Sequence, residues 1–283
     1  MNYRLVLNLS EGFVPLGGTS PNRLFAFPGG EQHVDVSNIK GKSCLITARL
    51  MNSDHIMQVL LAADALKRNG VKKIGLFAPY IPYARQDRVA APWDPLSIRV
   101  MASLINSAGF ADVYVLDAHS PVTLALINNV RELDWLTWAK DAFMEQQEKF
   151  NTGRDSIIVA PDAGAAKKIE RLAHDTITDF MCLRKERDAL SGELNVFTPV
   201  FVHDMDITVV DDICDGGATF IQIAKQFADA GNSLHLIVTH GIFSRGLGPL
   251  YAAGYQSIHT SDSWGNGVGQ NLYVHGVPTE VAK

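Results

Sequence analysis

The segment from Val209 to Phe220 holds the residues whose types and order are best suited to chemistry. An apolar run is followed by three aspartates, two glycines and a threonine. The amides of a glycine turn that opens a helix can bind phosphate oxygens, with the positive end of the helix dipole behind them. Neighbouring carboxylates can accept hydrogen bonds from the ring hydroxyls of a sugar. The pattern predicts a ribose-phosphate site formed by Asp211, Asp212, Asp215, Gly216, Gly217, Ala218 and Thr219.

A plain strand-to-helix turn is the alternative interpretation of this segment, with an acidic side chain capping the helix. Capping needs one carboxylate, whereas the segment offers three. We therefore favour the ribose-phosphate site. A glycine-rich loop alone is a weak signal, so other segments have to agree with it.

Two further polar clusters follow apolar runs, at Asp117-Ala118-His119 and at Pro161-Asp162-Ala163-Gly164. His119 and Asp162 could share a magnesium ion, which keeps several waters and usually completes its shell with substrate phosphates. Histidine is an uncommon magnesium ligand. The alternative is that His119 is a structural residue held by hydrogen bonds.

Two basic clusters add candidates for binding polyphosphate. Arg85-Gln86-Asp87-Arg88 follows an apolar run, and arginine can make bidentate hydrogen bonds to phosphate oxygens. Arg184-Lys185-Glu186-Arg187 precedes Ser191-Gly192-Glu193, which is typical of the turn of a protruding hairpin. A basic hairpin could close over a reacting phosphate. Solvent-exposed charge runs are the alternative for both clusters.

The elements that position these clusters form an alternating pattern of short apolar runs and helix-length segments. Such alternation predicts parallel sheets covered by helices on both faces, and hence an α/β fold. In open sheets of this kind the ligand crevice lies beyond the carboxyl ends of the strands, where the polar clusters fall. The predicted strands are 44–47, 74–78, 113–116, 157–159, 207–210 and 234–238.

Two helical segments each end at a glycine that precedes a strand. The first runs from Asp54 to Asn69 before Gly70, and the second from Thr219 to Ala230 before Gly231. This faint repeat predicts two related domains, residues 1–145 and 146–283. The polar segment from Glu145 to Asp155 is the expected boundary.

Composition limits the classes of function. The chain has 283 residues, 47% of them hydrophobic, and a net charge of -5, which argues against a nucleic-acid-binding surface. Its three cysteines are far apart and form no zinc or disulfide pattern. The first nine residues do not predict a signal peptide, and no apolar span reaches about 18 residues. We expect a cytoplasmic protein with no membrane partner.

Taken together, the segments resemble the ribose-phosphate pyrophosphokinases, also called phosphoribosyl diphosphate synthetases. The resemblance covers most of the chain. Phe27-Pro28-Gly29-Gly30-Glu31 is similar to the adenine-contacting motif of that family, and the segment from Ala78 to Arg88 is nearly diagnostic. Asp117-Ala118-His119 is similar to the metal-histidine motif. Lys185 with Arg187 matches the catalytic basic pair, and 210–219 matches the ribose-phosphate loop.

The resemblance implies an enzyme with two phosphoribosyltransferase-like domains, each a mostly parallel sheet flanked by helices. It implies Mg²⁺-dependent transfer of a diphosphoryl group from ATP to the anomeric hydroxyl of a ribose 5-phosphate, with AMP leaving. Lys185 and Arg187 would be catalytic, and His119 and Asp162 would bind the metal. A homo-oligomer, dimer-based and often hexameric, is expected. The residues implied in ATP binding are Phe27, Glu31, Arg85, Gln86 and His119.

The chain departs from the family pattern in two places that affect its substrates. Gly29 stands where the family usually has Asp or Asn, which removes one polar contact to adenine. Asp215-Gly216-Gly217-Ala218-Thr219 replaces the usual Asp-Thr-Ala-Gly-Thr, so a hydroxyl is lost and space is gained. A substituted 5-phosphate needs that space. An acceptor such as ADP-ribose, used in NAD salvage, is therefore an alternative substrate.

Two rival interpretations remain for the whole chain. A phosphoribosyltransferase would share the ribose-phosphate loop, but it has no use for the segments implied in ATP binding. A catalytically silent regulatory subunit would keep the fold and modulate an active partner. The presence of His119, Asp162, Lys185 and Arg187 together argues against it.

Overall fold

A computed structural model describes residues 3–150, 152–187, 194–197, 202–227, 231–265 and 267–280, with the backbone alone at 184–187 and 194–197. The chain divides into two compact units, Met1–Trp135 with Gly276–Lys283, and Leu136–His275. The boundary expected at 145/146 falls inside helix α4 (Trp135–Phe150). The polar residues that suggested a linker continue this helix, because its solvent side is polar.

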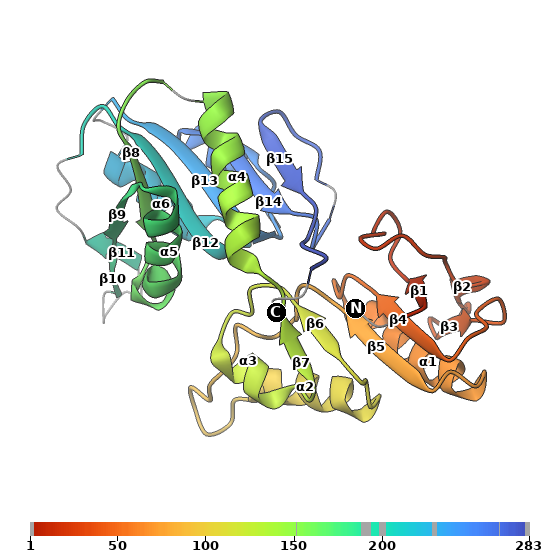
Figure 1. The fold of residues 1–283 in the computed structure, drawn as a ribbon. Coiled ribbons are helices and arrows are strands. Elements are labelled where there is room, and N and C mark those ends of the chain that lie inside the picture. The colour runs from red at the N-terminus through yellow and green to blue at the C-terminus, as the bar shows by residue number, and fades with distance from the viewer. Residues whose placement is uncertain are drawn as a thin grey trace. The chain divides into compact units, whose positions relative to one another are not determined.

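The first unit is built on a five-stranded parallel sheet in the order β1-β4-β5-β6-β7. Helix α1 is capped by Asn52, whose Oδ1 accepts from the amide of His55 at 3.0 Å, and it ends before Gly70 at φ +86°. The elements, in part visible in Figure 1, are β1 (Leu5–Asn8), β2 (Arg23–Ala26), β3 (Gln32–Asp35), β4 (Ser43–Thr47), α1 (Ser53–Arg68), β5 (Lys73–Phe77), α2 (Ser97–Ser107), β6 (Val113–Val115), α3 (Pro121–Leu126) and β7 (Val130–Glu132).

The second unit is built on a six-stranded parallel sheet in the order β15-β14-β13-β12-β8-β9. Strands β10 and β11 form a separate antiparallel hairpin. The further elements are β8 (Ser156–Ala160), α5 (Ala163–Thr176), β9 (Asp179–Cys182), β10 (Arg184–Arg187), β11 (Leu194–Phe197), β12 (Asp206–Cys214), α6 (Ala218–Phe227), β13 (Ser233–Gly241), α7 (Gly248–Ala252), β14 (Tyr255–Ser261) and β15 (Leu272–His275).

The two faces of the second sheet differ in chemistry. Val209, Leu236 and Ile258 belong to an apolar core cluster that includes Phe220 and Ile223 of α6. Strand neighbours point to the opposite face, because side chains alternate along a strand. That opposite face is covered by α4, which lies along the sheet in Figure 1.

The face under α4 combines apolar side chains such as Val210 and Ile237 with buried polar ones. Thr208 Oγ1 donates a hydrogen bond to Gln146 Oε1 of α4 at 3.1 Å, and the ring of Phe150 lies 5.3 Å from the ring of His235. His235 and His259 have no exposed surface. The helix therefore packs on two buried imidazoles.

A third histidine extends this cluster to the sheet edge. His259 Nδ1 lies 3.0 Å from His275 Nε2, and the ring of Tyr273 stacks on His259 at 4.6 Å. His275 Nδ1 lies 3.5 Å from Glu145 Oε2 of α4. Burial lowers the pKa of His235 to about 4 and that of His259 to about 3, so both are neutral at physiological pH.

Acid should therefore destabilise the second unit. The unfolded chain binds protons below its histidine pKa near 6.5, whereas folded His235 and His259 do not until pH 4 or lower. Between these two pKa values, each histidine lowers the free energy of unfolding by on the order of 1.4 kcal/mol for each unit by which the pH falls. We expect the thermal midpoint to fall between pH 7.5 and 5.5, and His235→Asn to flatten that dependence. His174→Asn, at an exposed position, is the control, and an unchanged slope in His235→Asn would contradict the assignment.

Candidate active site

The predicted ribose-phosphate segment lies at the carboxyl end of the second sheet. Strand β12 is longer than expected: it pairs with β8 as far as Val209 and with β13 as far as Cys214. The expectation that Asp211 and Asp212 follow the end of the strand is therefore corrected. Both lie on β12, in the part that extends beyond its pairing with β8.

Asp211 occupies a costly position for a carboxylate. The amide of Asp212 donates to Asp211 Oδ1 at 2.9 Å. Burial raises the pKa of Asp211 well above its usual range, the charge of Asp212 raises it further, and Lys168 of α5 partly offsets the effect. A carboxylate pair kept under such conditions is typical of a functional site. Sequence reasoning missed Lys168, since nothing in a helical sequence marks it as facing β12.

The glycine turn joins β12 to α6. Gly217 has φ +79°, and a Cβ atom on it would lie 3.1 Å from Leu250 Cδ2, so the turn depends on glycine there. A Cβ atom on Gly216 would instead meet only Arg245 Nε at 3.6 Å and Ser244 Oγ at 3.9 Å. The turn thus packs against Leu250 at Gly217 and lies beside the guanidinium of Arg245 and the hydroxyl of Ser244 at Gly216.

The loop that carries Ser244 and Arg245 is held against this turn. The amides of Ile242 and Phe243 donate to Cys214 O at 2.9 and 3.1 Å, and the amide of Ser244 donates to Asp215 O at 3.2 Å. Sequence reasoning missed Ser244 and Arg245. The sequence offered only one sign of them, a single basic residue shortly after the predicted strand 234–238. That residue gains meaning only from the pairing of β12 with β13.

Asp162 lies at the carboxyl end of β8, the neighbour of β12. It is the N-cap of α5, and its Oδ1 accepts from the amides of Gly164 at 2.9 Å and Ala165 at 3.3 Å. The carboxylate is thereby held in a fixed orientation. A capping role is shown, and a metal-binding role stays a prediction.

Lys185 and Arg187 lie on β10, which pairs with β11 in antiparallel register. The predicted hairpin is thus present in the backbone. The side chains of both residues, and the turn at 188–193, lie outside the described residues.

In the first unit, Arg85 and Gln86 follow β5 and are exposed. The hydroxyl of Ser97, the first residue of α2, donates to Gln86 Oε1, and the amide of Ile98 donates to Gln86 O at 3.4 Å. The segment is thus tied to the start of α2.

His119 follows β6, which pairs with β5. Asp117 is buried with φ +47°, and the amide of Ala118 donates to Glu132 Oε1 at 3.2 Å. This bend leaves His119 exposed. Arg85, Gln86 and His119 thus follow neighbouring strands of one sheet.

Phe27 and Glu31 lie on the β2–β3 hairpin, which forms a two-stranded sheet separate from the one that carries Arg85, Gln86 and His119. The amide of Phe27 donates to Glu31 O at 2.8 Å, so the two residues close the hairpin. The Phe27 ring is 45% exposed and lies 5.0 Å from the ring of Phe25 and 5.6 Å from that of His33. An exposed aromatic cluster of this kind can stack on a planar ligand.

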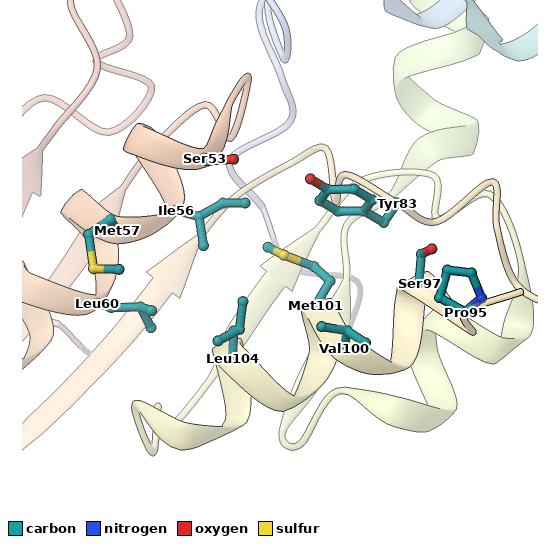
Figure 2. Close-up of a pocket in the computed structure, with 10 residues that line it drawn as sticks. All are labelled: Ser53, Ile56, Met57, Leu60, Tyr83, Pro95, Ser97, Val100, Met101 and Leu104. Carbon is teal, nitrogen blue, oxygen red and sulfur yellow. The ribbon is translucent and has the colours of Figure 1, made fainter. Parts of the chain in front are cut away.

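An apolar pocket of about 380 Å³ opens between α1 and α2, next to the Arg85 segment. Figure 2 shows side chains of the two helices turned toward each other, with Tyr83 and Ser97 at the polar end. Val100 is 58% exposed, Met57 47% and Leu104 42%. We call this the α1–α2 groove.

Within the described part of the chain, no group of three or more His, Cys, Asp or Glu side chains is arranged to hold a metal ion. Nor does any described helix have the length and apolarity needed to cross a bilayer.

Comparison with known proteins places these features in one family. Residues 18–109 match the N-terminal domain of ribose phosphate pyrophosphokinase. The ribose-phosphate pyrophosphokinase of Aeropyrum pernix is 32% identical over 222 residues, which cover 76% of this chain and 70% of that protein. That of Granulibacter bethesdensis is 31% identical over 239 residues, covering 82% and 74%.

The fold agrees with a solved structure. The crystal structure of phosphoribosylpyrophosphate synthetase from Mycobacterium smegmatis superposes with a TM-score of 0.81 at 21% identity, covering 96% of this chain and 94% of that one. The predicted α/β class, with mostly parallel sheets flanked by helices, is confirmed. The chain therefore belongs to the ribose-phosphate pyrophosphokinase family, and the predicted enzyme class is confirmed.

Proposed function

We propose that this enzyme transfers the diphosphoryl group of ATP to the anomeric hydroxyl of a ribose 5-phosphate moiety, giving phosphoribosyl diphosphate and AMP. The observation that carries the proposal is the glycine turn at 216–217. It opens α6 beside Arg245, with Asp211 and Asp212 on the strand that leads into it. Turn amides and the guanidinium suit a phosphate, and the two carboxylates suit ribose hydroxyls.

The chemical step is an in-line displacement at the β-phosphorus of ATP. The anomeric oxygen attacks the β-phosphorus, and the bond from that phosphorus to the oxygen shared with the α-phosphorus breaks. AMP leaves with that oxygen, and the hydroxyl proton is released. We assign Lys185 and Arg187 to the transferring and leaving oxygens, where fixed positive charge lowers the barrier. Arg85, Gln86 and His119 hold the nucleotide, with Phe27 and Glu31 on its adenine. Most of the catalysis is positioning and electrostatics.

Magnesium fits the available donors. The ion is usually bound by one or two protein side chains, with waters and substrate phosphates filling the other positions, so a cluster of three ligands is not required. The fixed orientation of the Asp162 carboxylate supports a ligand role, and His119, exposed after β6, is proposed as a ligand as well. When bound, the ion offsets charge on the ATP phosphates.

A direct product assay tests the proposal. Purified enzyme with magnesium, ATP and ribose 5-phosphate should form AMP and phosphoribosyl diphosphate in equal amounts, read by mass spectrometry. A phosphoribosyltransferase would form no AMP from ATP, and a silent regulatory subunit would form neither product.

We also propose that a second copy of the chain covers the α1–α2 groove, in a homo-oligomer based on dimers. Exposed apolar side chains on two facing helices support this, since large apolar patches usually mark interfaces. A hexamer is the assembly that the family resemblance implies.

A charged residue in the groove should therefore dissociate the oligomer. We expect Leu104→Glu to lower the molar mass measured by light scattering after size exclusion, because a buried unpaired carboxylate costs several kcal/mol. Ile177→Glu, at a position 97% exposed in the second unit, is the control. An unchanged mass for Leu104→Glu would place the interface elsewhere.

A further inference from the structure

A second pocket, of about 430 Å³, lies in the second unit at the carboxyl ends of β13 and β14. Its lining includes Ile242, Phe243, Leu247, Tyr251, Trp264 and Val268, together with five glycines. We call it the loop-side pocket. The pyrophosphokinase reaction on ribose 5-phosphate gives it no role, because a terminal phosphate would end at the glycine turn.

The loop-side pocket is continuous with the ribose-phosphate turn through one loop. Ser244 and Arg245 of this loop face Gly216, at 3.9 and 3.6 Å from the position of a Cβ atom there. Phe243 and Gly246, on either side of them, line the pocket. A group attached to a phosphate at the turn would therefore meet the pocket next.

The aromatic wall of the pocket is held in a conformation that is rarely adopted. Phe243 has φ +48°, in the left-handed region that a bulky side chain seldom occupies. A Cβ atom on residue 241 would clash with Cε2 of the Phe243 ring, so this position of the ring requires glycine at 241. Strained residues of this kind cluster at ligand sites.

The segment that leads into Trp264 is held by buried hydrogen bonds. Ser261 Oγ donates to Thr239 O at 2.6 Å, and Ser263 Oγ lies 2.7 Å from His240 Nδ1. These four residues are buried and fix the chain just before Trp264. The hydroxyl of Tyr251 donates to Gln270 O at 2.6 Å and closes the end of the same loop. Hydrogen bonds thus hold the segments on either side of Trp264, and three aromatic residues, Phe243, Tyr251 and Trp264, line the pocket.

We propose that the loop-side pocket binds an apolar or aromatic group, such as a nucleoside, linked through phosphate to the 5-oxygen of the acceptor ribose. The proposal rests on the proposed function and specifies its acceptor: a ribose whose 5-phosphate is substituted. The turn supports this, because Gly216 places no side chain between the turn and the side chains of Ser244 and Arg245. The reaction is unchanged: the anomeric oxygen attacks the β-phosphorus of ATP, AMP leaves and the proton is released.

Substrate preference in the full-length enzyme tests the proposal. With magnesium and ATP, kcat/KM is measured for ADP-ribose and for ribose 5-phosphate by AMP release and by mass spectrometry of the product. We expect ADP-ribose to be used. Trp264→Ala should lower kcat/KM for ADP-ribose by roughly tenfold or more, as loss of a base-stacking residue does, with a change below about threefold for ribose 5-phosphate. Trp93→Ala, at an exposed position in the first unit, is the control.

Val268→Glu provides a second variant that leaves folding intact, because Val268 is 98% exposed at the pocket. Its carboxylate should also disfavour ADP-ribose selectively. Use of ribose 5-phosphate but not ADP-ribose would overturn this proposal and leave the proposed function standing. Equal losses for both acceptors in both variants would also overturn it, whereas failure of both acceptors in the wild type would overturn the proposed function as well.

Discussion

Lys185→Ala and Arg187→Ala should each lower kcat by about a hundredfold or more, with little change in KM for the acceptor. The reason is electrostatic. A cation positioned at the transferring phosphoryl group acts mainly in the transition state, and loss of one such preorganised contact typically has this effect. The measurement is steady-state AMP release with saturating magnesium-ATP.

The β10–β11 hairpin supplies a matched control. Residues two apart on a strand share a face, so positions 185 and 187 lie on one face of β10 and position 184 on the other. Arg184→Ala removes the same charge from the same strand and should leave kcat within a few-fold of wild type. Wild-type turnover in Lys185→Ala and Arg187→Ala would show that the hairpin lies outside the reaction.

Strand positions followed well from the sequence. All six predicted apolar runs overlap strands of the two parallel sheets, and Gly70 follows the end of α1 with positive φ, as expected. Gly231 also has positive φ, whereas residues 228–230, the predicted end of the second helix, lie outside the described residues. These predictions succeeded because burial on both faces favours a run of apolar residues, and because glycine adopts the left-handed conformation at a helix end without steric cost.

The predictions that failed depended on neighbours distant in sequence. The sequence of β12 turns polar at Asp211, so its end was expected there, yet pairing with β13 continues to Cys214. Arg245 gains significance only because its loop is hydrogen-bonded to Cys214 and Asp215. Lys168 likewise faces Asp211 only once α5 has packed beside β12. Local patterns carry no record of such pairings.

The buried histidines show a related limit. His235 and His259 interrupt apolar runs, and composition alone would place them on a solvent face. The structure buries both: the ring of Phe150 in α4 lies 5.3 Å from that of His235, and the ring of Tyr273 stacks on that of His259. The polar residues that suggested a boundary at Glu145–Asp155 include the end of α4, where Gln146 accepts a hydrogen bond from Thr208 of the sheet.

Substitution of Asp211 should separate a role in acceptor binding from a role in folding stability. Its pKa is raised by burial and by Asp212, so ionising it in the folded protein is unfavourable. A carboxyl group with a raised folded pKa stabilises the fold while protonated and loses that contribution as the pH rises through that pKa. Removing the charge should therefore leave stability equal or higher at neutral pH. A residue kept only for structure would show the opposite result.

Asp211→Asn should lower kcat/KM for the acceptor by about tenfold to a hundredfold, because a hydrogen bond from a ribose hydroxyl to a charged acceptor contributes roughly 1.5–3 kcal/mol. The thermal midpoint should stay unchanged or rise. Asp179→Asn, at an exposed position on β9 of the same unit, is the control for both measurements. In the wild type, KM for the acceptor should rise as the pH falls through the raised pKa of Asp211, and Asp211→Asn should lack that rise. A variant with wild-type kcat/KM and a lowered thermal midpoint would assign Asp211 to the fold and remove it from the acceptor site.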